Sequence, residues 1–169
     1  WVTEAYMGTV TVRWNPPLDT GGLLLSGFAV YRGESESDLE KVSDVPFDET
    51  RFEDSDLDDG TEYVYCICAV NEIGEGPRGS LIDVTPVGVP SKVNDLKIEA
   101  ITDTVDIEWL PPDDDHGSDV MGYYIYKGTS PVNLEMWKQT DSNKLTVSDE
   151  DVETGTYYYR VVPYNSVRT

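Results

Sequence analysis

An internal repeat with an offset of 95 residues constrains the fold of this chain more than any other feature of its sequence. Residues 1–61 align with residues 96–156 without a gap, and 19 of the 61 aligned positions are identical. Unrelated sequences of average composition match at about one position in fifteen, so the chain contains a duplication. A repeat of this length is too long for a solenoid unit and is typical of tandem domains.

The chain length agrees with two small domains. The 169 residues suit two domains of about 85 residues, near the lower end of the usual domain size. We expect a first domain over residues 1–86, a short proline-containing linker over residues 87–91, and a second domain over residues 92–169.

The repeated segments alternate apolar and polar residues, which predicts half-buried strands. Residues 9–14 place Val10, Val12 and Trp14 on one face, and residues 27–32, 39–42 and 51–54 are further predicted strands. The segment 60–71 returns as 155–165, each copy entered from a glycine turn. Many short strands separated by Gly and Pro turns indicate a β-sandwich.

Two details of the segments 60–71 and 155–165 carry predictions. Pro163 cannot donate to a ladder, so we expect an edge strand or a bulge there. Cys66 and Cys68 are the only cysteines and share the outer face of their strand. Residues two apart on an extended strand lie close to or beyond the usual disulfide distance, so we expect free thiols.

The balance of charge excludes two classes of partner. The chain has 33 Asp and Glu against 12 Lys and Arg, a net charge of −21. Nucleic acids and anionic membranes are bound by clustered Lys and Arg, which neither half contains, and no apolar run is long enough to span a membrane. The acidity has three interpretations: adaptation to high salt, cation binding, or a solubilising coat.

No motif in the sequence indicates catalysis. The chain has one histidine, His116, and lacks the nucleophile-elbow, metalloprotease, P-loop and dinucleotide-binding motifs, so we predict that it is not an enzyme. Asp54 and Asp149 occupy matched positions and are expected to accept hydrogen bonds from turn N–H groups. Calcium binds six to eight oxygens and is the one cofactor left open, its candidate ligands being Asp113, Asp114, Asp115 and Asp119.

Several repeated segments resemble the fibronectin type III family over essentially the whole chain. They are WNPP at 14–17 and WLPP at 109–112, GFAVY at 27–31 and GYYIY at 122–126, and LDDGTEY at 57–63 with VETGTY at 152–157. In that family a tyrosine after the glycine turn bonds through its hydroxyl to the backbone, a role that the resemblance assigns to Tyr63 and Tyr157. The double glycine before the third strand and the aspartates at 54 and 149 are similar to microbial members.

The resemblance implies an all-β chain of two immunoglobulin-like β-sandwiches in tandem. By the repeat offset, Trp1 corresponds to Leu96 and the sequence stops soon after Asn165. We therefore expect the first sandwich to lack the start of its first strand and the second to lack its last strand, as in a piece of a longer chain. An open sheet edge that accepts a strand from a neighbouring molecule is the alternative.

The family serves many functions, so three hypotheses stay open. The first is a non-catalytic binding or spacer module of a larger extracellular or cell-surface protein, active in adhesion or protein–protein interaction. The second is a structural subunit of an extracellular filament or surface layer, and the third is an accessory region of a secreted carbohydrate-active or proteolytic enzyme. The partner would be a protein, a glycan or a neighbouring subunit.

Loops at the ends of a sandwich are the expected contact sites. They are residues 18–25, 71–78 and 113–120, and the side chains singled out in the first two are Leu23, Leu24, Leu25, Glu72, Ile73 and Arg78.

Overall fold

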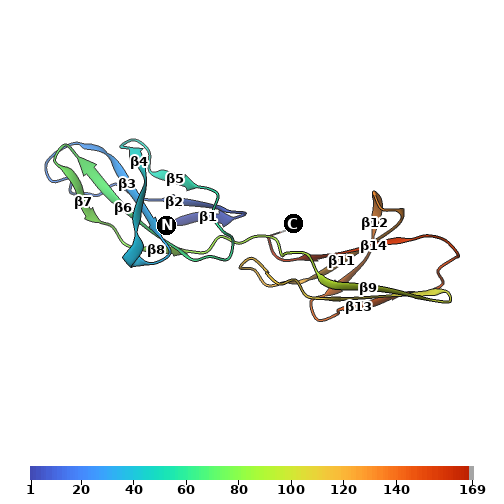
Figure 1. Cartoon of the computed structure of the whole chain (residues 1–169). Helices are drawn as coiled ribbons and strands as arrows, with labels where there is room; N and C mark the ends of the chain where they lie inside the picture. The colour runs from blue at the N-terminus through green and yellow to red at the C-terminus, as the bar shows by residue number, and fades with distance from the viewer. Residues whose placement is uncertain (168–169) are drawn as a thin grey trace. The chain divides into compact units, whose positions relative to one another are not determined.

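The computed structural model describes residues 1–167, which fold as two compact units, Trp1–Val87 and Gly88–Thr169. Both units consist of antiparallel strands, and the one helical element among the described residues is a short 3-10 turn, η1 (Glu36–Asp38) (Figure 1). No helix in the described part of the chain has the length and apolar character needed to cross a membrane.

The first unit is a sandwich of two sheets. One sheet has the order β1-β2-β5, and the other has the order β4-β3-β6-β7 with β8 also paired to β6. These strands are β1 (Val2–Tyr6), β2 (Thr9–Arg13), β3 (Leu25–Gly33), β4 (Glu40–Pro46), β5 (Arg51–Asp54), β6 (Tyr63–Asn71), β7 (Gly74–Arg78) and β8 (Ile82–Val84).

The core of the first unit lies between these sheets and confirms the predicted inward face of β2. Val10 and Val12 are fully buried, and Trp14 is 9% exposed. The Trp14 ring meets the Phe28 ring edge-on, with centroids 5.4 Å apart. Tyr65 of β6 and Val30 of β3 complete the centre of this core.

The second unit repeats the arrangement with six strands among its described residues. One sheet has the order β13-β10-β9, and the other has the order β12-β11-β14. These strands are β9 (Asn94–Ile101), β10 (Thr104–Leu110), β11 (Gly122–Ser130), β12 (Asn133–Asp141), β13 (Thr146–Asp149) and β14 (Tyr158–Tyr164).

Trp109 marks the core of the second unit, as Trp14 marks that of the first. It is 2% exposed and meets the Tyr123 ring edge-on at 5.3 Å. Among the described strands, β14 is an edge of its sheet. The edge position predicted for Pro163 is therefore confirmed, because a residue without an N–H is tolerated there.

The predicted tyrosine role is confirmed in the first unit. The Tyr63 hydroxyl accepts a hydrogen bond from the backbone N–H of Asp58 at 3.1 Å. Tyr157, its counterpart, lies before β14, and its ring packs against Lys127, whose Nζ is 4.8 Å from the ring centroid.

The cysteines of β6 agree with the prediction, and the segment after β6 does not. Cys66 and Cys68 are free thiols on the outer face of β6, and both are buried, because Ala29, Tyr31, Leu39 and Val70 cover that face. The segment predicted as a loop over residues 71–78 contains strand β7, which pairs with β6. Glycine and proline indicated a turn there, but an edge strand tolerates Pro77.

Candidate binding surface

Asn71, at the end of β6, brings two of the three predicted contact loops together. Its side-chain amide donates to the carbonyl of Thr20 at 3.2 Å, and its side-chain oxygen accepts from the N–H of Ile73 at 2.9 Å. The same side chain thus fixes both the loop between β2 and β3 and the turn between β6 and β7. Sequence analysis missed this role, although asparagines occupy matched positions at the end of β6 and directly after β14.

The turn between β6 and β7 is tight and projects two exposed side chains. Asn71 and Gly74 are paired across the two strands, so Glu72 and Ile73 form the turn. Gly74 has φ of 142°, a region that favours glycine because it has no Cβ. Ile73 is therefore held outward, with 84% of its surface exposed.

Strand β7 is anchored beside this turn by polar contacts on its outer side. Glu75 accepts hydrogen bonds from the Tyr31 hydroxyl at 2.6 Å and from Lys41 Nζ at 3.2 Å. The Tyr31 hydrogen bond, followed by that of Lys41, holds the pKa of Glu75 below its ordinary value. The Arg78 guanidinium lies 4.9 Å from the centroid of the Tyr31 ring, which is a cation–π distance.

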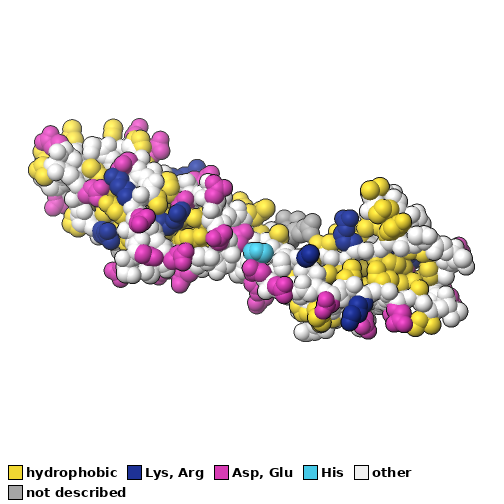
Figure 2. Space-filling model, viewed as in Figure 1, with side chains coloured by type: hydrophobic (Ala, Val, Ile, Leu, Met, Phe, Trp, Pro, Cys, Tyr) yellow, Lys and Arg dark blue, Asp and Glu magenta, His cyan; other side chains and the backbone are white. Residues whose placement is uncertain are grey.

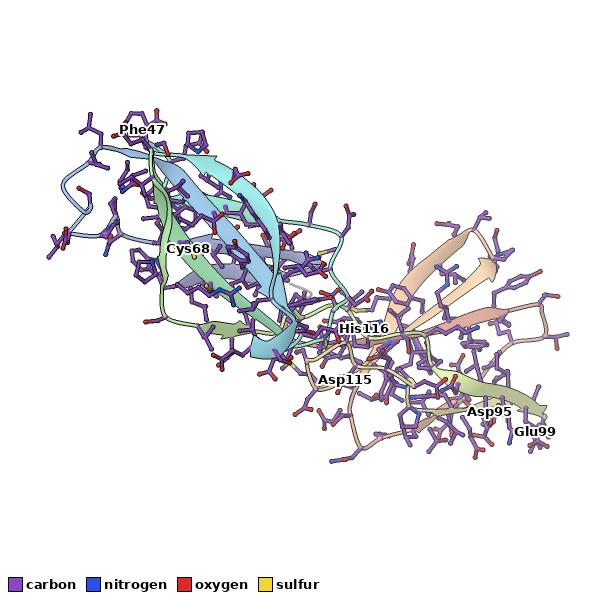
Figure 3. All side chains as sticks on the ribbon, turned by 60° about the vertical axis from the view of Figure 1, so that its left-hand side comes forward. Phe47, Cys68, Asp95, Glu99, Asp115 and His116 are labelled. Atoms are coloured by element: carbon purple, nitrogen blue, oxygen red, sulfur yellow. The ribbon has the colours of Figure 1, made fainter. Side chains whose placement is uncertain are left out.

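Exposed apolar side chains gather at the end of the first unit that holds this turn. Strand pairing places Leu25 opposite Asn71 and Gly27 opposite Pro46, so three connections meet at one end. We define the apolar tip as the exposed apolar residues of these connections: Leu18, Leu24, Phe47 and Ile73. Apolar side chains are visible at this end in Figure 2, and Phe47 projects from it in Figure 3.

The structure changes part of the predicted contact set. Leu24, Glu72, Ile73 and Arg78 are exposed, as a contact role requires. Leu23 and Leu25 are half-buried, and Leu25 packs against the core, so the leucine run is not one exposed patch.

Leu18 and Phe47 belong to the apolar tip but were missed in the sequence. Phe47 follows Pro46 at the end of β4 and is 60% exposed. The available signal was a bulky apolar residue immediately after a proline, between two predicted strands.

A groove of about 720 Å³ opens next to the apolar tip, between the two sheets of the first unit. Its floor contains Trp14, which directly follows β2, and Phe28, Ile67 and Ala69 from the core-facing sides of β3 and β6. Its lining also includes Asp19, Ile73 and Glu75 from the two predicted contact loops, and Asn15 and Pro17 from the segment just before the first of them. Its volume is in the range of ligand-binding clefts.

The third predicted loop, residues 113–120, lies in the second unit and is held by Asn165. The Asn165 side chain is buried, and its amide donates to the carbonyls of Gly88 at 2.7 Å and Ser118 at 3.1 Å. His116 of this loop is half-buried, and its Nε2 lies 3.6 Å from Asp114 Oδ2. Figure 3 marks Asp115 and His116 in this loop.

The calcium candidates in this loop bond mainly to the protein itself. Asp113 accepts from the Asn94 side-chain amide at 2.8 Å, Asp114 from the N–H of His116 at 2.7 Å, and Asp115 from the N–H of Gly117 at 3.0 Å. Asp119 is exposed. Among residues 1–167, no three carboxylate, thiol or imidazole side chains are placed to share a metal ion.

The matched aspartates at 54 and 149 bond to side chains within the described part of the chain, and not to turn N–H groups as expected. Asp54 Oδ2 accepts from the Tyr65 hydroxyl and from Arg32, both at 2.8 Å. Asp149 Oδ2 accepts from the Tyr159 hydroxyl at 2.5 Å and pairs with Lys127 Nζ at 2.6 Å. Burial, followed by the hydrogen bond to the aspartate, raises the pKa of both tyrosines. In the first unit this hydrogen bond joins the two sheets, because Asp54 lies on β5 and Tyr65 lies on β6.

The duplicated unit provides an internal comparison for the apolar tip. By the 95-residue offset, Leu18, Leu24 and Phe47 correspond to Asp113, Asp119 and Ser142. The two units share their fold and their core tryptophan, so the fold itself does not require apolar residues at these places.

The chain is similar to several known proteins. The fibronectin type III domain model matches residues 2–85. Slow-type myosin-binding protein C of Rattus norvegicus is 28% identical over 92% of this chain, which spans 26% of that protein. Receptor-type tyrosine-protein phosphatase F of Danio rerio is 29% identical over 98% of this chain, which spans 9% of that protein. A two-domain fibronectin type III segment of chicken tenascin has a TM-score of 0.47 and 22% identity, covering 98% of this chain and 89% of that one.

The chain belongs to the fibronectin type III family and contains two such units in tandem. A fibronectin type III domain is typically a non-catalytic module, and relatives of this chain include proteins named for binding myosin. The chain spans about a quarter of the myosin-binding protein C and about a tenth of the receptor-type phosphatase. The microbial character suggested by the glycine and aspartate positions stays a prediction.

Proposed function

We propose that this chain is a non-catalytic pair of modules within a larger extracellular or cell-surface protein, and that the apolar tip of the first unit binds a protein partner. The observation that carries the proposal is the difference between two units of one fold. The first unit exposes Leu18, Leu24 and Phe47 where the second has Asp113, Asp119 and Ser142. Exposing apolar side chains together in water is unfavourable, and such patches mark interaction sites.

The chemistry of the tip favours a protein over a glycan. The tip consists of aliphatic and phenyl side chains on connections that Asn71 holds in place. Aromatic and aliphatic anchors surrounded by polar residues are the usual centre of a protein interface. Glu72 and Arg78 supply charged groups on the β6–β7 hairpin itself.

The similarity to a receptor-type phosphatase supports a location at the cell surface or outside the cell. Several fibronectin type III units in one chain act as spacers as well as binding modules, because each unit adds a fixed length. Adhesion is the activity that combines both properties, and it is the specific form of the proposal.

The test is binding of the full chain to a panel of purified surface and secreted proteins, with a glycan array in parallel. The double variant Leu24→Asp with Ile73→Asp should bind its partner at least about tenfold more weakly, since two apolar anchors are lost. Val132→Asp, at a site 92% exposed in the second unit, is the matched control and should bind normally. Equal binding by all three proteins, or binding to glycans alone, would refute the proposal.

A further inference from the structure

Exposed carboxylates lie directly beside the apolar side chains of the apolar tip. Asp48 and Glu49 follow Phe47 in the connection between β4 and β5, and Glu72 precedes Ile73 in the turn between β6 and β7. All three acidic side chains are exposed. Figure 2 shows acidic side chains beside apolar ones at this end of the first unit. A partner that covers the apolar tip must therefore also meet these carboxylates.

No basic side chain compensates the carboxylates within the tip itself. The three connections, residues 14–24, 47–50 and 72–73, contain no lysine or arginine. Within residues 1–167, no ion pair reaches any of the three acids. On the neighbouring strands, Lys41 is held by two ion pairs and Arg78 lies against a tyrosine ring. The three carboxylates are therefore free to interact with a partner.

The acids between β4 and β5 are specific to the first unit. By the 95-residue offset, Asp48 and Glu49 correspond to Asn143 and Lys144 of the second unit. The second unit has a neutral and a basic residue at these places, although it has the same fold. The fold does not require acidic residues here, just as it does not require the apolar residue beside them.

We propose that the protein partner of the apolar tip binds it through an apolar site surrounded by lysine and arginine side chains. This inference rests on the proposed binding function and names the chemistry of the partner's surface. An apolar centre with a polar rim is the usual arrangement of a protein interface. Opposite charges on the two rims increase the association rate and suppress binding of acidic competitors.

The same charges disfavour two other occupants of the tip. In a contact between two copies of the chain through their tips, Asp48, Glu49 and Glu72 of one copy would face the same acids of the other, and like charges that face each other are unfavourable. An anionic membrane surface attracts basic segments and repels acidic ones. A basic protein surface is the occupant that matches both the apolar and the charged groups.

The probe for this proposal is a library of random peptides displayed on phage. The library is selected on the full chain and depleted on the variant Leu24→Ser with Ile73→Ser. This variant loses two apolar anchors and keeps the net charge, so peptides attracted by acidity alone bind both proteins and are discarded. The peptides that remain should combine aromatic or aliphatic residues with an excess of Lys and Arg over Asp and Glu.

A synthetic copy of the most enriched peptide then tests the charges themselves. Glu49→Gln with Glu72→Gln should slow its association with the full chain at least about fivefold in about 20 mM sodium chloride, and should change its dissociation little, because charges around a contact act mainly on the encounter. The matched control is Glu34→Gln with Glu36→Gln, which removes two exposed carboxylates after the other end of β3. The control should slow association by less than about twofold.

Two results would overturn this inference and leave the proposed function in place. One is a set of tip-dependent peptides without an excess of Lys and Arg relative to the unselected library. The other is equal slowing by the two double variants, which would show that the overall charge acts and not the acids of the tip. The absence of any tip-dependent peptide would remove the inference and the proposed function together.

Sedimentation of the full chain and binding to phosphatidylcholine vesicles test the remaining occupants. We expect neither dimerisation nor vesicle binding. Either result, if Leu24→Ser with Ile73→Ser abolished it, would assign the tip to a second copy or to a lipid surface and would overturn the proposal.

Discussion

At the scale of single residues, both units contain the same buried cluster of an aspartate, a tyrosine and a cation, and the cation is an arginine in one unit and a lysine in the other. Asp54 joins Tyr65 and Arg32 in the first unit, and Asp149 joins Tyr159 and Lys127 in the second. Each aspartate is less than 10% exposed. A buried carboxylate is costly unless it is paired and hydrogen-bonded, so the tyrosine and the cation are needed together.

We predict that a buried ion pair contributes more to the free energy of unfolding of this chain than an exposed one. Asp54→Ala leaves a buried tyrosine hydroxyl and a guanidinium without their acceptor, and should lower the free energy of unfolding by about 3 kcal/mol. Asp44→Ala removes an ion pair with Lys41 in which the carboxylate is 74% exposed, and should cost about 1 kcal/mol or less. Urea denaturation followed by tryptophan fluorescence measures both, and equal losses would contradict the prediction.

At the scale of strands, β6 is buried on both faces, and this explains where its thiols lie. Tyr65 faces the main core, while Cys66 and Cys68 face a second cluster with Ala29. Figure 3 marks Cys68 within the strands of the first unit. Burial, followed by the neighbouring Cys66, raises the pKa of Cys68 to about 11.

The two thiols should therefore be unreactive in the folded chain. Cys68, with this pKa, has roughly a hundredfold less thiolate near pH 8 than a free cysteine. Burial blocks access of a reagent to both thiols. A colorimetric disulfide reagent should react with neither thiol in buffer and with both in denaturant. Cys66→Ala, which keeps Cys68 alone, serves as the control, and fast reaction of either protein without denaturant would show that the second cluster opens readily.

The sequence predicted features that depend on local patterns and missed features that depend on contacts between distant segments. Alternation predicted the strand at 51–54 and the inward face of Val10 and Val12, because these patterns are local. The cover over Cys66 comes from Leu39 and Tyr31, whose approach depends on strand pairing and not on nearby sequence. The partners of Asp54 are likewise 11 and 22 residues away, so the turn role assigned from sequence was wrong.

The candidate surface was predictable in part for a related reason. Loops at the ends of a sandwich follow from the fold, and Leu24 and Ile73 were identified in this way. Whether a loop residue points outward depends on its hydrogen bonds and packing contacts. Leu25 pairs with β6 and packs on the core, whereas Ile73 is held outward by a hydrogen bond to Asn71. Contacts such as the pairing of Leu25 with β6 join segments that are distant in the sequence, so they are known only from the structure.

At the scale of the whole molecule, the dominant property is a net charge of −21 on 169 residues. Acidic side chains are spread over the visible face of both units and are not gathered in one patch (Figure 2). Repulsion among them destabilises the folded chain at low ionic strength. Dissolved salt weakens this repulsion, and at 0.1 M it largely screens exposed charges that are more than about 10 Å apart.

Because the net charge is strongly negative, we predict that sodium chloride stabilises both units against unfolding. Raising its concentration from about 20 mM to about 0.5 M should increase Tm by roughly 3–8 °C, which corresponds to about 1 kcal/mol in a unit of this size. Calcium chloride at the same ionic strength should add nothing further, since Asp113, Asp114 and Asp115 already accept hydrogen bonds within the protein. Calorimetry distinguishes the outcomes: a Tm independent of sodium chloride would refute the repulsion argument. An excess effect of calcium that Asp113→Asn abolishes would instead assign the acidity to cation binding at the loop after β10.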